Sequence, residues 1–251
     1  MSASRTPGNH RDQLREQQEQ VAQRARERRL TTVMVLVVVL LVVGGGTGFQ
    51  FWRTSRAPSA APATAGTFAP VRVVAGEPLV LGVAPDPAQQ RKAPVRVQLY
   101  EDFHCQHCAE FEDAFGPTLS AAQTDGKIAI ELYPMSFIDQ GSAAAANAMA
   151  CAADAGFGQS YYLGLFANHT LRWRDSQLID LAAKAGTTVP PSFNACVTGR
   201  SQQEWVSSIN TTAQRNGVTA TPTMFVDHAP VDIAKLTPES LSSMIDRAVS
   251  Q

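Results

Sequence analysis

Neither positive nor negative charge is in excess in this sequence, and this absence narrows the classes of protein it can encode. Its 251 residues contain 21 Lys and Arg against 22 Asp and Glu, for a net charge of -1. No basic stripe is therefore available to bind nucleic acid, as a nuclease or a nucleic-acid deaminase requires. The sequence also lacks a phosphate-cradling glycine loop, because its glycine triplet, residues 44–46, lies in an apolar segment. No nucleophile–base triad stands out either.

Charged residues are missing altogether from residues 30–52, which contain an unbroken apolar run at 33–43. This stretch of 23 positions is long enough to cross the hydrocarbon core of a bilayer. Residues 1–29 carry seven Arg against four acidic residues, and positive charge stays on the cytoplasmic side. We therefore expect a cytoplasmic basic tail, a single transmembrane helix in the cell membrane, and an extracytoplasmic remainder.

A cleaved signal peptide is the alternative for this segment, with the small residues at 60–65 as the cleavage region. Those residues lie well beyond the apolar run, and the basic tail is long for a signal, so we favour the anchor. The Ala- and Pro-rich stretch 53–70 predicts an extended linker, and residues 71–251 are expected to form the folded domain. Both alternatives place this domain where disulfides are permitted.

Cysteine is scarce as well: there are four, and two of them form a C-x-x-C motif, Cys105 and Cys108. Residues 94–100 before the motif alternate as in a strand, and residues 109–122 after it carry apolar side chains at helical spacing. The unpaired N–H groups and the dipole of a helix N-terminus lower the pKa of Cys105 by about one unit. His107 is expected to add to this as a donor or a cation beside the sulfur. Cys105 is therefore predicted as the accessible nucleophile, and Cys108 as the more buried resolving thiol.

A zinc site is the alternative for the same motif, because it contains four side chains of ligand type: His104, Cys105, His107 and Cys108. Four ligands within five residues do not easily form one tetrahedral site, and structural zinc sites bring a second pair from elsewhere. Covalent haem attachment needs a His after the second cysteine, where Ala109 stands. We therefore favour redox chemistry, with no metal and no cofactor.

The other two cysteines, Cys151 and Cys196, are either a structural disulfide or a second redox pair. An extracytoplasmic compartment favours the structural bridge. Closing a loop of about 46 residues contributes about 4 kcal/mol to the free energy of unfolding in the chain-entropy model.

The remaining chain predicts a mixed α/β domain. Residues 71–81 predict short strands, with a hairpin at a sheet edge. Residues 127–133 form a strand that is parallel to strand 94–100 in a βαβ unit. Residues 230–233 suit an edge strand after the apolar strand that ends before Asp227.

Residues 141–216 contain no convincing strand and predict a block of five helices. Ser142 caps the first, Asp175 caps the third, and Ser201 with Glu204 forms a capping box for the fifth. The second helix is expected at 159–168 and the fourth at 190–199, and a final helix begins at Thr237 and Pro238.

This pattern resembles the thioredoxin fold, and the helical insertion resembles the DsbA family of extracytoplasmic thiol:disulfide oxidoreductases. The residues that carry the resemblance are 100–108 with the C-x-x-C motif and 217–223 with the sequence Thr-Pro-Thr. The resemblance implies an α/β thioredoxin fold with an all-helical insertion, preceded here by the transmembrane helix. It also implies that Pro222 is a cis-proline packed against the cysteine pair, and that Thr221 presents its backbone to substrate peptides.

Two residues depart from the family pattern. The dipeptide between the cysteines is Gln106-His107, where the family often has Pro-His. Many relatives carry a buried carboxylate six residues before the first cysteine, where this chain has Leu99. Glu101 and Asp102 are candidates to replace it.

The resemblance implies a disulfide oxidase that acts on reduced secreted or cell-envelope proteins. It would be reoxidised by a quinone-linked membrane protein of the DsbB or VKOR type, and no nucleic acid takes part. The alternatives are a tethered thiol reductase or disulfide isomerase and, from another class, a redox-inert chaperone or metal-binding module.

Overall fold

The computed structural model describes residue 59 and residues 72–81, 95–185 and 189–250. All of these residues belong to one compact unit, Arg53–Gln251. Within the described residues, no helix is long and apolar enough to cross a membrane. The expected tail and transmembrane helix lie outside the described residues, as does the linker apart from Ser59. Ser59 exchanges backbone hydrogen bonds with the Asn168 side chain.

The described strands form a single mixed sheet. In chain order they are β1 (Leu79–Leu81), β2 (Val95–Glu101), β3 (Ile128–Pro134), β4 (Thr223–Val226) and β5 (Ala229–Pro230). Their order in space is β1-β3-β2-β4-β5. The predicted parallel pair is confirmed, since β2 runs parallel to β3 with Val97 opposite Ile130 and Leu99 opposite Leu132. These side chains are buried, so Leu99 is a core residue.

Two predictions at the sheet edges need correction. β1 is an edge strand, but it pairs antiparallel with the distant β3 instead of closing a hairpin with its neighbour in sequence. β5 ends at Pro230, and residues Ile233–Lys235 form a 3-10 helix where the edge strand was expected to continue. Proline has no N–H to donate to a ladder, which limits strand pairing there.

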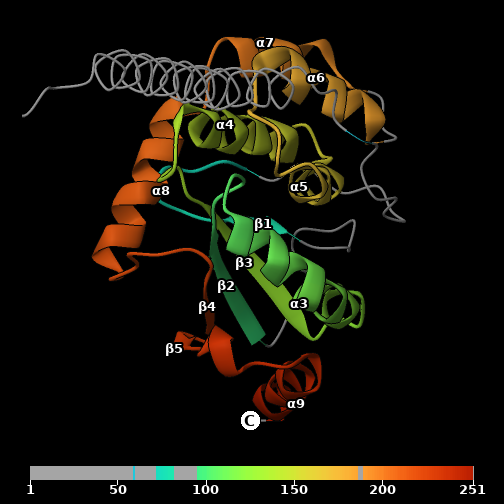
Figure 1. Ribbon diagram of the computed structural model, residues 1–251, viewed down its shortest axis with the longest axis vertical. Coiled ribbons are helices and arrows are strands. Elements are labelled where there is room, and N and C mark those ends of the chain that lie inside the picture. The colour runs from blue at the N-terminus through green and yellow to red at the C-terminus, as the bar shows by residue number, and fades with distance from the viewer. Residues whose placement is uncertain (1–58, 60–71, 82–94, 186–188, 251) are drawn as a thin grey trace, which may run out of the picture. The chain divides into compact units, whose positions relative to one another are not determined.

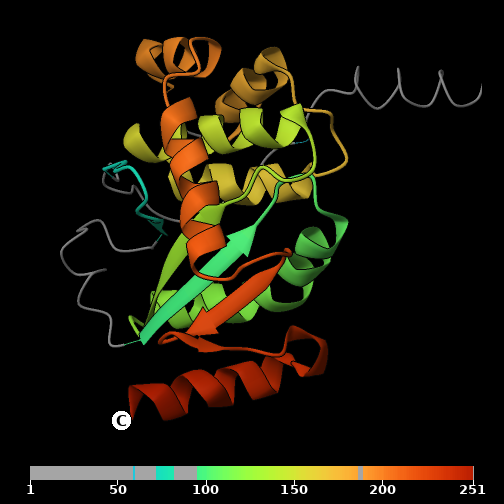
Figure 2. The same cartoon turned by 90° about the vertical axis from the view of Figure 1, so that its left-hand side faces the viewer.

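Helices pack around the sheet (Figures 1 and 2). They are α3 (Gln106–Thr124), α4 (Gln140–Asp154), α5 (Gly158–Ala167), α6 (Asp175–Lys184), α7 (Pro191–Thr198), α8 (Gln203–Arg215) and α9 (Pro238–Val249). Helix α3 contacts β3 and α9, and α9 contacts β2. The five helices α4 to α8 form the predicted insertion between β3 and β4, and α4 packs against the other four.

The predicted helix starts in the insertion are shifted. The cap of α4 is Asp139, whose carboxylate accepts the backbone N–H of Ser142, so Ser142 lies inside the helix. Asp175 is the first residue of α6 and not its cap. The capping box of Ser201 with Glu204 does not form, because the chain makes a turn at Ser201 and α8 begins at Gln203.

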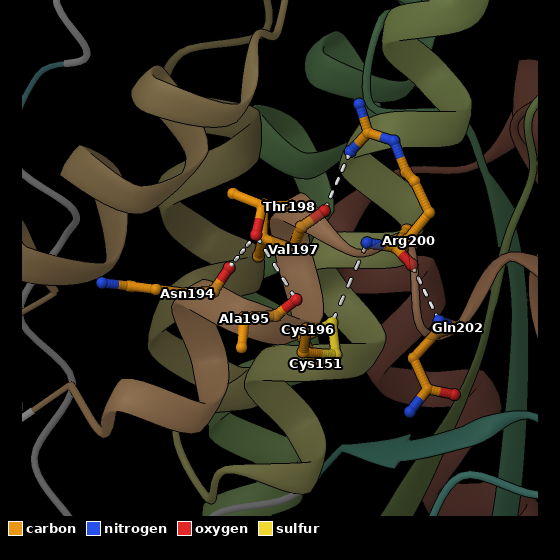
Figure 3. The surroundings of a disulfide bond; sticks show 9 residues. Cys151, Asn194, Ala195, Cys196, Val197, Thr198, Arg200 and Gln202 are labelled. Atoms are coloured by element: carbon orange, nitrogen blue, oxygen red, sulfur yellow. Dashed lines mark hydrogen bonds between the residues drawn. A yellow bond between two sulfur atoms is a disulfide. The ribbon is translucent and has the colours of Figure 1, made fainter.

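Cys151 of α4 and Cys196 of α7 form a disulfide, with their Cα atoms 6.0 Å apart and a sequence separation of 45 (Figure 3). The predicted pairing is therefore present. Cys151 is buried and Cys196 is partly buried against the same hydrophobic core. The bond ties the first helix of the insertion to its fourth.

Candidate active site

The C-x-x-C motif lies at the junction of β2 and α3. Cys105 is the N-cap residue of α3, and Cys108 is the third residue of the helix. Both cysteines are free thiols, so the structure holds the dithiol form. Cys105 is 8% exposed and Cys108 is 0% exposed. The predicted order of accessibility is therefore present, with a small opening over Cys105 and a closed environment around Cys108.

The surroundings of Cys105 stabilise its thiolate. Its pKa falls to about 5, chiefly because the Cys108 thiol donates a hydrogen bond to the Cys105 sulfur. The Thr221 side chain and the backbone N–H groups of Cys108 and His107 lower the pKa further, and burial opposes them. The helix N-terminus therefore acts as the sequence predicted, but the larger effect comes from the second cysteine.

Cys108 has the opposite electrostatic environment. Burial raises the pKa of its thiol far above the ordinary value, and the hydrogen bond to Cys105 and the charge of Glu101 act in the same direction. At neutral pH the pair is therefore a thiolate at Cys105 and a thiol at Cys108. In this form Cys105 is the nucleophile and the better leaving group.

A proline loop faces the cysteines from the other side. The Thr221–Pro222 peptide bond is cis, as the resemblance implied. The carbonyl oxygen of Thr221 lies 3.6 Å from the Cys105 sulfur and accepts its S–H when the thiol is protonated. The loop thus brings a backbone segment directly before β4 against the nucleophile.

His107 acts on Cys105 by a different route from the expected one. Its side chain is 79% exposed, and the ring nitrogen Nδ1 lies 3.0 Å from the Glu110 carboxylate. This hydrogen bond raises the pKa of His107. The stabilising contact with the Cys105 thiolate comes from the backbone N–H of His107. The imidazole ring acts on the Cys105 thiolate only through the electrostatic attraction of its positive charge.

Asp102 fixes the loops around the motif. It is fully buried, and both carboxylate oxygens are occupied by donors. Oδ1 accepts the backbone N–H of His104 and the hydroxyl of Ser142, and Oδ2 accepts the backbone N–H groups of Phe137 and Ile138. Asp102 thereby links His104, the residue before the nucleophile, to the start of the helical insertion.

Asp139 makes a second tie between the same segments. Besides capping α4, its carboxylate accepts a hydrogen bond from His104 Nδ1 at 2.7 Å and pairs with Arg172 at 2.5 Å. Neither Asp139 nor Arg172 was predicted as part of this site. A local sequence pattern could not have predicted them, because their contacts join residues more than 30 positions apart.

Glu101, four residues before Cys105, is fully buried at the end of β2. Its Oε2 accepts a hydrogen bond from the Tyr162 hydroxyl of α5 at 2.5 Å, and its Oε1 has no partner. Burial raises the pKa of Glu101 well above its usual range, and the nearby Glu112 adds to this. The sequence named Glu101 only as one of two candidates, with Asp102, to replace the buried carboxylate of the family, and it gave no sign of Tyr162.

Within the described residues there is no group of three or more His, Cys, Asp or Glu side chains placed to hold a metal ion. His104 and His107 are turned to different carboxylates, Asp139 and Glu110.

A protein family model and several solved structures are similar to this chain. A family model described as thioredoxin matches residues 90–247. Reduced DsbA from Mycobacterium tuberculosis has 25% sequence identity and a TM-score of 0.56, over 72% of this chain and 92% of that chain. MdbA, a thiol-disulfide oxidoreductase from Actinomyces oris, has 25% identity and a TM-score of 0.54, over 62% and 81%.

Oxidised BdbD from Bacillus subtilis shares the fold at 20% identity, with a TM-score of 0.58 over 74% of this chain and 100% of that chain. None of the curated proteins matches the chain. The structural neighbours therefore include thiol-disulfide oxidoreductases, and the chain has the mixed α/β fold of the DsbA type.

Proposed function

The chain belongs to the thioredoxin family, and from this premise we propose that it is an extracytoplasmic thiol:disulfide oxidase acting through Cys105 and Cys108. Its substrates are reduced secreted or cell-envelope proteins. The observation that carries the proposal is the contrast between the two thiols. The pKa of Cys105 falls to about 5, whereas burial raises that of Cys108. A stabilised thiolate favours the reduced enzyme, and this preference makes the disulfide form an oxidant.

The reaction proceeds by two exchanges. A substrate thiolate attacks Cys105 of the oxidised enzyme, the Cys105–Cys108 bond breaks, and the electron pair passes to the Cys108 sulfur, which takes up a proton. A second substrate thiolate then attacks the mixed disulfide and Cys105 leaves as a thiolate. The substrate has lost two electrons to the enzyme. The Thr221 backbone lies beside the Cys105 sulfur, and in this proposal it pairs with the substrate peptide.

Continued turnover needs a partner that removes these electrons, and we assign this role to a quinone-linked membrane protein of the DsbB or VKOR type. Residues 30–52 supply the membrane anchor in this proposal, with the N-terminus cytoplasmic. Tethering both proteins to one membrane raises their effective concentration. Alkaline carbonate extraction of membranes tests the anchor: release of the chain into the supernatant would contradict it.

The redox potential of the full chain tests the oxidase proposal. Reference potentials are about -120 mV for DsbA and about -270 mV for thioredoxin, a gap of roughly 7 kcal/mol for two electrons. The protein is equilibrated in glutathione buffers, and the Cys105–Cys108 couple is followed by alkylation and mass spectrometry. We expect a value nearer the first reference. A value nearer the second would contradict the oxidase and favour a tethered reductase, and a pair that never forms a disulfide would favour a redox-inert module.

A further inference from the structure

The resolving thiol Cys108 is closed off from water, so its proton must come from and return to the protein. Cys108 is 0% exposed. During disulfide opening its sulfur leaves with an electron pair, and a bare thiolate in an apolar site is costly. The family position for a buried carboxylate holds Leu99, a core residue. A proton donor for Cys108 must therefore be sought elsewhere in the site.

Two buried carboxyl groups, those of Asp102 and Glu101, lie shortly before Cys105 in the sequence. Their hydrogen bonds differ, and this difference indicates different roles. Asp102 has both oxygens occupied by four donors, as described above. Neither oxygen of Asp102 is therefore without a donor. Glu101 has one oxygen without a partner, although it is 0% exposed. A buried carboxyl with an unused oxygen is stable when that group is protonated.

Glu101 is connected outward through Tyr162 and Glu112. The Tyr162 hydroxyl donates to Glu101, and the same hydroxyl interacts with Glu112. Glu112 is only half-buried, although its Oε1 is closed off and has no partner. Burial raises the pKa of Glu112 to about 7, so it exchanges protons readily at neutral pH. The Tyr162 ring is held in place by Phe103 and Phe166.

We propose that Glu112, the Tyr162 hydroxyl and Glu101 form a proton relay that serves Cys108. Glu101 gives its proton to the Cys108 sulfur when the disulfide opens, and it takes the proton back when the disulfide forms. The proposal rests on thiol–disulfide exchange at Cys105 and Cys108, and it holds for an oxidase or a reductase alike. The helical insertion thereby supplies part of the redox machinery, since Tyr162 lies on α5.

Each direction of the reaction balances with this assignment. On reduction, an attacking thiolate forms a bond to Cys105, the Cys105–Cys108 bond breaks, and Cys108 takes the proton of Glu101, which becomes a carboxylate. Glu112 then restores the Glu101 proton through the Tyr162 hydroxyl. On oxidation, Glu101 first passes its proton outward by the same route. Cys108 next attacks Cys105 of a mixed disulfide, its proton moves to Glu101, and the bound thiolate leaves.

The titratable groups that act on Glu101 are few. They are Glu112 on α3, Cys105 at the N-cap of α3, and Tyr162 on α5. Cys108 is affected by Cys105 and Glu101. A pH profile of exchange at Cys108 therefore reports mainly on Glu101 and Glu112, once the ionisation of the attacking thiol is divided out.

The test measures both half-reactions of the full chain in stopped flow over a range of pH. Reduction of the oxidised form uses dithiothreitol, with rates divided by the dithiothreitol thiolate concentration, and oxidation of the reduced form uses oxidised glutathione. We expect E101Q to slow both directions by about 10²-fold, the lower range of general acid–base effects. The normalised wild-type reduction rate should fall as pH rises through the ionisation of Glu101, and this dependence should vanish in E101Q.

Y162F separates a relay from a structural role. It leaves Glu101 able to donate its proton but blocks the outward path, so oxidation should slow by about tenfold while reduction stays near the wild-type rate. Y161F is the matched control, because Tyr161 is a buried tyrosine of the same helix whose hydroxyl binds the Leu178 carbonyl. It should change neither rate.

Wild-type rates and pH profile in E101Q would overturn the role of Glu101, and equal behaviour of Y162F and Y161F would overturn the relay. If E101Q does not fold, infrared difference spectra of the oxidised and reduced wild-type chain replace it. A carboxylic acid band that changes between the two forms supports the proposal, and its absence contradicts it. These tests compare each variant with the wild type and need no value of the redox potential, so the relay and the oxidase assignment can fail separately.

Discussion

At the scale of single residues, the thiolate of Cys105 depends on the thiol of Cys108 more than on the helix dipole. The hydrogen bond from Cys108 is the largest contribution to the lowered pKa of Cys105. We therefore expect alkylation of reduced Cys105 by iodoacetamide to titrate with a midpoint near pH 5. In C108A the midpoint should rise, because only Thr221 and the backbone N–H groups remain. An unchanged midpoint in C108A would assign the effect to the helix N-terminus alone.

The sign of this shift fixes the pH range in which the reduced form is favoured. The pKa of Cys105 is depressed in the folded dithiol, so its stabilising contribution is fully present above the ordinary thiol pKa. It is lost as the pH falls through about 5. At pH 7 the contribution is at most about 3 kcal/mol, because solvent screens part of it. The excess melting temperature of the reduced over the oxidised chain should therefore shrink on acidification, which serves as a control for the alkylation titration.

Site residues could be predicted where their role follows from the local sequence, and could not where it depends on contacts with distant residues. Cys105 and Cys108 follow from a local motif at a strand–helix junction. Glu101 and Asp102 could be named only as equal candidates, because the hydrogen bonds that distinguish them come from residues 137–142 and from Tyr162. Tyr162 carried no signal, since an aromatic residue on an apolar helix is ordinarily a core residue.

At the scale of elements, hydrophobic periodicity located the strands and helices within a few residues, but cap chemistry did not follow from residue type. A cap needs both an acceptor side chain and the right backbone angles. Thr237 has both: its backbone is extended, its hydroxyl oxygen accepts the Ser240 N–H, and Pro238 follows at the first helical position. Ser201 has the residue type but lies in a turn two residues before α8.

This contrast gives a paired prediction for the two helix starts. T237A should lower the free energy of unfolding by about 1 kcal/mol, the usual value of a lost N-cap, while S201A should change it by less than about 0.5 kcal/mol, as for an ordinary surface site. Urea unfolding of the full chain followed by circular dichroism measures both. Equal losses in the two variants would mean that Ser201 caps α8 after all.

At the scale of the whole folded domain, the insertion interrupts a thioredoxin fold without disturbing its sheet, and it contacts the active site at a few defined points. Asp139 binds His104, Ser142 binds Asp102, and Tyr162 binds Glu101. Asp139 caps α4, Ser142 lies in α4 and Tyr162 lies in α5, so the first two helices of the insertion make these contacts. The disulfide instead joins α4 to α7, at Cys151 in the last turn of α4.

The Cys151–Cys196 bond should therefore stabilise the insertion without taking part in the redox reaction. The variant C151S/C196S leaves no new free thiol, and by the chain-entropy model it loses about 4 kcal/mol, or about 10 °C in melting temperature for a domain of this size. Below that temperature its rate of dithiol oxidation should match the wild type, because the contacts of Asp139, Ser142 and Tyr162 with the motif do not involve the disulfide. Differential scanning calorimetry measures the melting shift, and a peptide dithiol assay measures the rate. Loss of activity with unchanged melting would make the bond a second redox pair, and the insertion would then carry electrons as well as protons.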